Sequence, residues 1–136
     1  MDLNLISGDG GDWESQVGAA IARVLEAKPA DHEWELRRFR EVMANAPKSV
    51  STLLGTPLPE DRLQSLLEVQ AFESAAREFS DVEQIEFMVS RRSDAFYLAV
   101  ITVPDIEQDF VGDASSEAFA YCIALARAAS FIASNG

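Results

Sequence analysis

The fold of this chain is decided by one apolar stretch, Ala95-Phe96-Tyr97-Leu98-Ala99-Val100-Ile101-Thr102-Val103. The stretch is rich in aromatic and β-branched residues and lies between the turn-forming pairs Ser93-Asp94 and Pro104-Asp105, which predicts a strand. A strand with one face in water alternates apolar and polar residues, whereas here both alternating sets are apolar. Both faces of this strand are therefore expected to be covered, by helices or by a second copy of the chain.

The neighbouring segments supply the strands that would pair with this one. Residues 84–90 alternate apolar and polar side chains, which predicts a half-buried strand, and Arg91-Arg92-Ser93-Asp94 is expected to form the hairpin loop that leads into 95–103. Residues 2–6 form a short extended segment with leucines on one side and are a candidate third strand. The acidic connection 105–113 has room for another short strand.

Most of the remaining chain shows the three-four spacing of apolar residues that is typical of amphipathic helices. The helix boundaries follow from cap residues before each segment and from prolines after it. The predicted elements are a helix from 13 to about 28 capped by Asp12, a helix from 32 to 46 capped by Asp31, short turns over 48–54, a helix over 60–79, and an alanine-rich helix capped by Asp113 or Ser115. The apolar stripe of 60–79 drifts around the helix axis, which predicts a bend near Gln70 or contact with two different neighbours. The small residues of the last helix would let it approach a sheet closely.

These elements predict a single α+β domain over residues 1–136. Its core is a small antiparallel sheet, made of the hairpin 84–90/95–103 with 2–6 as a candidate addition, packed between the C-terminal helix and several N-terminal helices. A chain of this length can bury a core without disulfides or a structural metal. A sheet of two or three strands has open edges, so a homodimer with a shared sheet is also expected.

Charge is the unusual feature of the composition. The chain has 23 acids and 11 bases, a net charge of −12, which argues against nonspecific binding to nucleic acids or anionic membranes. The single cysteine, Cys122, excludes an internal disulfide and a cysteine-based zinc site. The N-terminus lacks the pattern of a secretory signal, and the apolar run 118–133 is too short and is interrupted by Arg127, so it predicts a core helix. We expect a soluble cytoplasmic protein.

The sequence offers one candidate metal site. His32 is the only histidine, and helical spacing would let Asp31, His32 and Glu35 share a divalent cation. Acids also gather at helix starts because the helix dipole favours them there, and catalytic zinc usually has more than one histidine ligand. The dipole explanation is favoured, so no metal or other cofactor is expected. Without a recognisable nucleophile, base or metal set, an enzyme is left open but not favoured.

Two charged segments are candidate partner-binding sites. The run from Asp105 to Glu117 contains five acids and no base, and is either a solubilising surface or a docking face for a basic protein. Two arginines at the expected hairpin tip either are solvated or contact an acidic partner. The candidate partner-binding residues are Asp105, Glu107, Asp109, Asp113, Arg91 and Arg92.

Three dipeptides in the C-terminal part carry a resemblance to a known family. A strand ending in Pro104-Asp105, a short loop to Gly112-Asp113 and a helix opening with Glu117-Ala118 resemble the hairpin, loop and helix of HicB-type antitoxins over residues 96–126. The family's Leu-Pro-Gly-Cys segment is replaced here by Ile106-Glu107-Gln108-Asp109, and its DNA-binding part is absent. The resemblance implies a non-catalytic module that binds and masks a small basic toxin.

Three functions follow from these observations. The leading one is a non-catalytic binding or regulatory module that acts through protein–protein contacts. The second is the antitoxin or immunity-like version of that module, which masks a basic partner. The third is an enzyme or small-ligand-binding protein whose site the sequence does not reveal, and a deep pocket with convergent polar groups would favour it.

Overall fold

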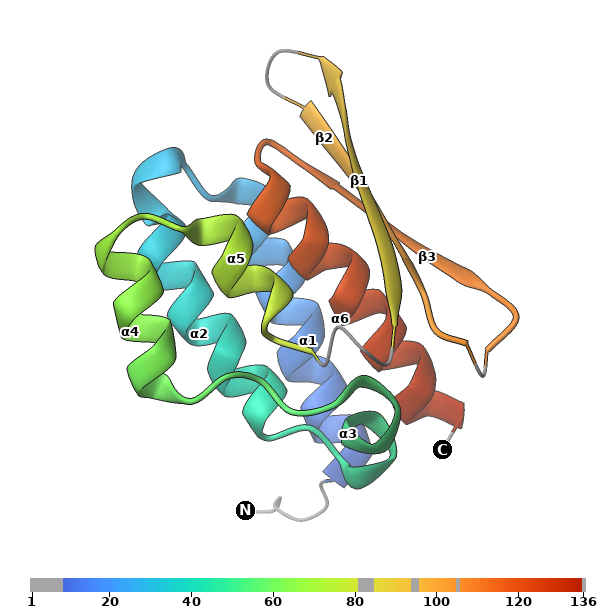
Figure 1. Cartoon of the computed structure of the whole chain (residues 1–136). Helices are drawn as coiled ribbons and strands as arrows, with labels where there is room; N and C mark the ends of the chain where they lie inside the picture. Colours follow the sequence, from blue (N-terminus) through green and yellow to red (C-terminus); the bar gives the residue numbers. More distant parts are fainter. Residues whose placement is uncertain (1–8, 81–84, 94–95, 105, 136) are drawn as a thin grey trace.

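The computed structural model describes residues 9–80, 85–93, 96–104 and 106–135. In these residues it has six α-helices, one short 3-10 helix and a three-stranded antiparallel sheet, which confirms the predicted α+β class (Figure 1). The elements in chain order are α1 Asp9–Glu26, the 3-10 helix η1 Pro29–Asp31, α2 His32–Ala44, α3 Lys48–Leu54, α4 Glu60–Glu68, α5 Phe72–Arg77, β1 Glu86–Ser93, β2 Phe96–Thr102, β3 Asp109–Ala114 and α6 Glu117–Asn135.

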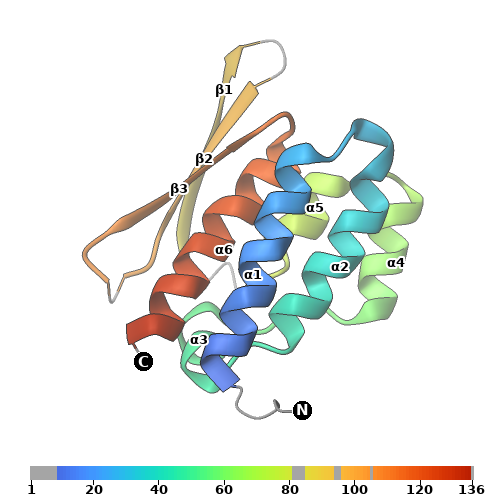
Figure 2. The same cartoon turned by 180° about the vertical axis from the view of Figure 1, so that it is seen from behind.

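The C-terminal helix α6 is the middle layer of the molecule. The sheet lies on one side of it, and α1 and α5 lie against it on the other, with α2 and α4 further out (Figures 1 and 2). The prediction that the sheet lies between this helix and the N-terminal helices is therefore wrong, because the helix lies between the sheet and the other helices. The physical reason is that residues 118–126 are apolar all round, and a helix of that kind must be covered on every side.

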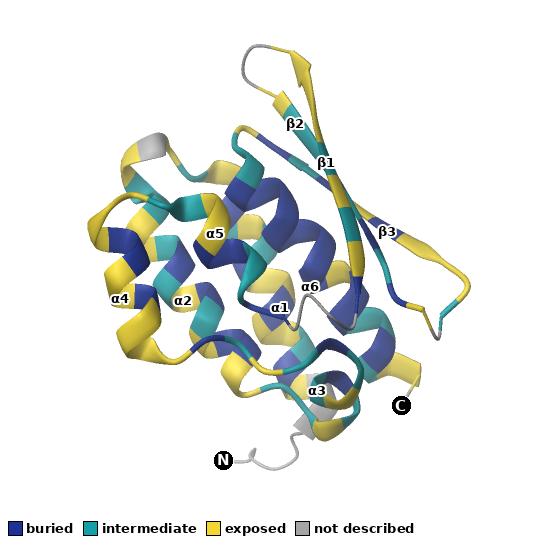
Figure 3. Cartoon of the chain, viewed as in Figure 1, coloured by how far each residue is buried: buried dark blue, intermediate teal, exposed yellow. Residues whose placement is uncertain are grey.

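Burial also explains the apolar composition of α6. It is the one described helix that is long and apolar enough to span a membrane by those criteria alone. Twelve of its residues are buried in the protein, including every residue from Ala118 to Ala126 (Figure 3). This fits the expected core helix of a soluble protein.

The strand β2 is the centre of the sheet, with β1 and β3 as its antiparallel neighbours. Ala99 and Ile101 point toward α6 and are fully buried. Among the described residues nothing covers the opposite side, where Phe96 is 42% exposed. The expectation of cover on both faces is thus met on only one within the chain. On the opposite face, Val100 is only partly exposed because the flanking strands place Met88 and Val111 on either side of it.

The segment boundaries confirm some sequence expectations and correct others. The connection 105–113 does supply a third strand, β3, whereas the candidate strand 2–6 lies outside the described residues. The arginines expected in the hairpin loop belong to β1, which continues to Ser93 through a β-bulge after Arg91. Pairing with β2 persists there because Arg91 lies opposite Tyr97. The predicted helix 60–79 is two helices, and Gln70, where a bend was predicted, has a positive φ of 59° that breaks it.

Helix caps were predicted less well than helices. Asp12 lies inside α1, which begins at Asp9. Asp31 precedes α2, but its side chain accepts the Lys28 amide at 2.9 Å instead of capping the helix. The last helix is capped by Ser116, not by Asp113 or Ser115, because Ser116 Oγ accepts the Phe119 amide at 3.2 Å.

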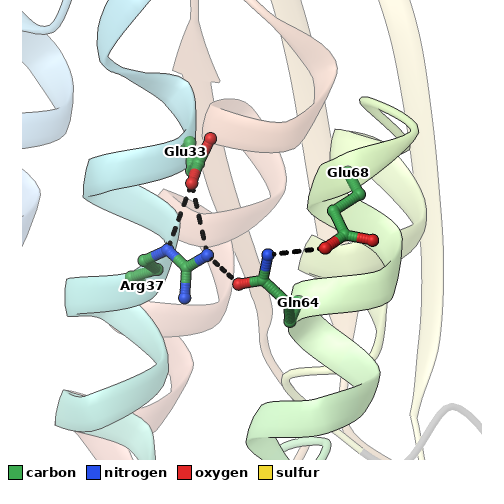
Figure 4. Close-up of polar contacts among 4 residues, drawn as sticks. All are labelled: Glu33, Arg37, Gln64 and Glu68. Carbon is green, nitrogen blue, oxygen red and sulfur yellow. Dashed lines mark hydrogen bonds and ion pairs between the residues drawn. The ribbon is translucent and has the colours of Figure 1, made fainter.

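The helical layers are joined by a few specific polar contacts. The buried Trp13 indole donates to the Val42 carbonyl at 2.7 Å and fixes α1 on α2. On the surface, Arg37 of α2 contacts both Glu33 and Gln64, and Gln64 donates to Glu68 at 3.0 Å, which links α2 to α4 (Figure 4). Arg37 and Glu33 pair at i,i+4 on the surface of α2.

Candidate functional site

The three candidate metal ligands have separate partners. Asp31 accepts the Lys28 amide, Glu35 pairs with Arg23 of α1 at 3.3 Å, and His32 Nε2 is 2.9 Å from Ser116 Oγ. Within the described residues, no group of three or more histidine, cysteine or acidic side chains is arranged to hold a metal ion. The acids at the start of α2 therefore act as separate hydrogen-bond and ion-pair partners.

His32 lies at a pocket that the sequence did not reveal. Its ring is stacked between Phe72 and Phe119, with centroid distances of 4.9 and 4.3 Å. Histidine and serine come from positions 84 residues apart, so no local pattern could have paired them. The pocket has a volume of about 190 Å³ and is lined by His32, Phe72, Glu73, Tyr97, Ser115, Ser116, Glu117 and Ala118.

A serine beside a histidine is also the arrangement of nucleophilic catalysis, so the geometry must distinguish the two roles. Here the Ser116 hydroxyl oxygen already accepts a hydrogen bond from the Phe119 amide, because Ser116 is the cap of α6. Glu73 and Glu117 line the same pocket, and their negative charge would oppose an oxyanion developing there. The arrangement therefore supports a structural role, in which a stacked histidine holds the capping serine in place.

The capping role makes a direct prediction for stability. Replacing Ser116 with alanine should lower the free energy of unfolding by about 1 to 2 kcal/mol, because it removes both the cap and the partner of His32. The neighbouring Ser115 is exposed, so Ser115→Ala should change it by less than about 0.5 kcal/mol. Urea titrations of the two variants and the wild type measure the difference. Equal stabilities of the two variants would contradict the assigned cap.

The second candidate site is the outer face of the sheet, which is the side turned away from α6. Outside the bulged end of β1, strand alternation places ten side chains on it. Five are apolar and form one band across the three strands. The apolar band consists of Met88 from β1, Phe96, Leu98 and Val100 from β2, and Val111 from β3. The remaining residues of the outer face are Glu86, Ser90, Thr102, Asp109 and Asp113.

The apolar band is accessible to a partner. Met88 is 63% exposed and Val111 40% exposed, and both lie opposite Val100 in the sheet register. Acids lie at one end of the band and along its β3 side. Asp113 lies opposite Leu98 in the register, and at one end Glu86 and Asp109 flank Thr102, whose hydroxyl donates to Asp109 at 2.9 Å.

The candidate partner-binding residues do not form one continuous face. Asp109 and Asp113 lie on the outer face, and exposed Glu107 precedes β3. Arg91 and Arg92 are exposed at the opposite end of the sheet, on β1. Glu117, which ends the same acidic run, lines the His32 pocket instead. Asp105 lies outside the described residues.

The outer face was missed because the sequence of β2 alone predicts cover on both sides. The signal that could have revealed it lies in the flanking strands. Glu86 and Ser90 alternate with inward-facing apolar residues in β1, and Asp109 and Asp113 do so in β3. Acids on both neighbours of a doubly apolar strand indicate that one of its faces meets solvent or another protein.

Comparison of the chain with protein-family models, with curated proteins and with solved structures gives no match. The resemblance to HicB-type antitoxins therefore stays a prediction based on the quoted dipeptides. The structure places its region, residues 96–126, in β2, β3 and the first half of α6.

Proposed function

We propose that this protein is a non-catalytic binding module of the cytoplasm, and that its outer face docks a partner protein with an apolar centre and a basic rim. The observation that carries the proposal is the exposed apolar band with acids at one end and along its β3 side. Apolar patches with a polar rim are typical of protein–protein contact sites. The rim here is negative, through Glu86, Asp109 and Asp113.

Charge supports a basic partner in two ways. The whole chain has a net charge of −12, so a basic protein would be attracted before contact. At contact, the acids beside the apolar band would select for lysine or arginine at the partner's rim. Such an interface should associate faster at low ionic strength, since rim charges act mainly on the association rate.

The antitoxin-like function is a second, narrower version of the same proposal. The segment that resembles the HicB-type module, residues 96–126, contains Phe96, Leu98, Val100 and Val111, which are four of the five members of the apolar band. In this version the partner is a small basic toxin and docking masks its active surface. Neutralisation of the captured protein's toxicity on co-expression would separate this version from the general one.

The test compares two substitutions of matched exposure and charge. Met88, in the apolar band, is 63% exposed, and Val69, on the helical side, is 73% exposed. Tagged wild type, Met88→Glu and Val69→Glu are used to capture proteins from a lysate of the native host at low and high salt. We expect a basic protein that is retained by wild type and Val69→Glu, lost with Met88→Glu, and weakened by salt. Equal retention by Met88→Glu would exclude the outer face as the binding surface.

A further inference from the structure

We infer that the open edge of β1 pairs with β1 of a second copy of this chain, which joins two three-stranded sheets into one antiparallel sheet of six strands. This inference concerns the edge of the sheet, whereas the proposed function concerns its outer face. Among the described strands, the order β1-β2-β3 leaves β1 and β3 as edges. An edge strand presents unpaired backbone groups that another strand can bind.

The β3 edge is occupied by a side chain of the protein itself. Arg127 of α6 donates from Nη1 to the Val111 carbonyl oxygen at 2.6 Å. A cationic side chain bound at the middle of β3 blocks a strand from pairing there. Of the two edges, β1 is therefore the one open to a second chain.

The same contact fixes which groups β1 presents. In an antiparallel ladder, the backbone groups of successive residues point alternately to one neighbouring strand and the other. The Val111 carbonyl that Arg127 binds points away from β2, so the backbone groups of Val100, opposite Val111, point away from β3. They therefore form hydrogen bonds with the backbone of Met88 in β1. The backbone N–H and C=O of Phe87 and Val89 then point outward. Apart from the sheet ladder, no backbone–backbone hydrogen bond among the described residues involves β1.

Charge selects the register of the pairing. When Val89 lies opposite Val89 of the second copy, residues three positions away on either side also face each other. Glu86 then lies opposite Arg92 of the second copy, and the symmetry gives this pair twice. Opposite charges across two strands stabilise the pairing. Glu86 lies on the outer face, and Arg92 is the extra residue of the β-bulge at the other end of the strand.

Shifted registers lose this match. If Met88 instead of Val89 lies opposite its own copy, Glu86 faces Ser90. If Ser90 lies opposite its own copy, Arg92 faces Met88. A register shift of one residue would put the outer face of one copy on the same side of the joined sheet as the inner face of the other. The bulge after Arg91 places Arg92 at the end of the regular part of β1, where a long side chain can reach Glu86 of the second copy. The acid and the base at the two ends of β1 thus make this edge complementary to itself.

Pairing in this register has a consequence for the outer face. The two-fold axis is perpendicular to the sheet, so the outer faces of both copies lie on the same side and the apolar bands adjoin at Met88. Strands are about 4.8 Å apart, so the face would widen from about 14 Å to about 29 Å. A partner that contacts only one copy is unaffected, which keeps the two proposals separate.

The test is a charge exchange in the purified protein, measured by sedimentation equilibrium from low to high micromolar concentration. We expect the wild type to dimerise, Glu86→Arg and Arg92→Glu each to weaken dimerisation about tenfold or more, and the double exchange to restore it. Asp61→Arg, an exposed residue of α4, is the matched control and should leave dimerisation unchanged.

Two results would overturn the inference. One is a wild type that is monomeric over the whole concentration range. The other is a dimer that both single exchanges leave intact, or that the double exchange fails to restore, because then Glu86 and Arg92 do not face each other. Circular dichroism confirms that each variant is folded before sedimentation. The measurement uses the protein alone, so its outcome is independent of any partner of the outer face.

Discussion

Replacing Gly112 with alanine is expected to lower the free energy of unfolding by at least about 3 kcal/mol. Gly112 lies in β3 on the side that packs on α6. A Cβ atom there would lie 2.4 Å from both the Ala120 carbonyl oxygen and the Ala124 backbone nitrogen, and 2.9 Å from Ile123 Cβ. Two of these three atoms belong to the backbone of the central helix, which cannot move aside as a side chain could. The strand or the helix must therefore shift.

The shift would be costly because it separates a close contact between the sheet and α6. Ala99 lies opposite Gly112 on β2, and both face α6, whose backbone approaches Gly112 at Ala120 and Ala124. Small residues on both sides bring the backbones together, and dense packing leaves no space for an added methyl group. The loss is a large part of the roughly 5 to 15 kcal/mol by which domains are typically stable.

Gly18 in α1 provides the control for this substitution. A Cβ atom at Gly18 meets no other atom within 4 Å, and the residue is exposed. Gly18→Ala should raise the free energy of unfolding by about 0.5 to 1 kcal/mol, because alanine loses less backbone entropy in a helix. Urea denaturation of both variants gives the two values. If Gly112→Ala were as stable as the wild type, the close approach of β3 to α6 would be wrong.

The sequence predicted those features that depend on neighbouring residues. The hairpin was found to within a few residues, because alternation and turn residues are local signals, and the break at Gln70 followed from the drift of the apolar stripe in its helix. The alanine-rich composition of the last helix correctly indicated close packing on the sheet. Each of these signals lies within one continuous stretch of sequence.

Features that depend on distant contacts were not predictable. The order of the layers required knowing that α6 is covered on both sides, which depends on how α1 and α5 pack against it. The His32–Ser116 contact joins positions 84 residues apart. The outer face became visible only when the register placed polar residues of β1 and β3 beside the apolar ones of β2. The outer face is therefore recognised from the pairing of its three strands, whereas the sequence alone predicts only its charged residues.

Two neighbouring residues of α6 are expected to make the protein unstable in alkaline solution. Burial raises the pKa of the Tyr121 hydroxyl to about 12, and its hydrogen bond with Ser80, at 2.8 Å, opposes part of this shift. Burial also raises the pKa of the Cys122 thiol far above its usual range. Both groups are neutral when protonated, so the folded protein keeps protons that the unfolded chain releases at lower pH.

The sign of the effect follows from this difference. Because the pKa of Tyr121 is raised on folding from 10.0 to about 12, its contribution is complete below pH 10 and is lost as the pH rises toward 12. Cys122 acts in the same direction above pH 9.0, its ordinary pKa. At about 1.4 kcal/mol per pKa unit, Tyr121 alone accounts for roughly 2 to 3 kcal/mol. We expect the free energy of unfolding to fall steeply between pH 9 and 12.

Urea titrations at several alkaline pH values, repeated with two single variants and the double variant, assign this loss to its residues. Tyr121→Phe should be less stable than the wild type at pH 8, because buried Ser80 loses its hydrogen-bond partner, yet its stability should fall less above pH 10. Cys122→Ala should remove the part of the decline that begins near pH 9. The double variant should have the flattest profile, since other groups titrate alike in all four proteins. Parallel profiles for the wild type and the double variant would show that neither buried group causes the alkaline loss.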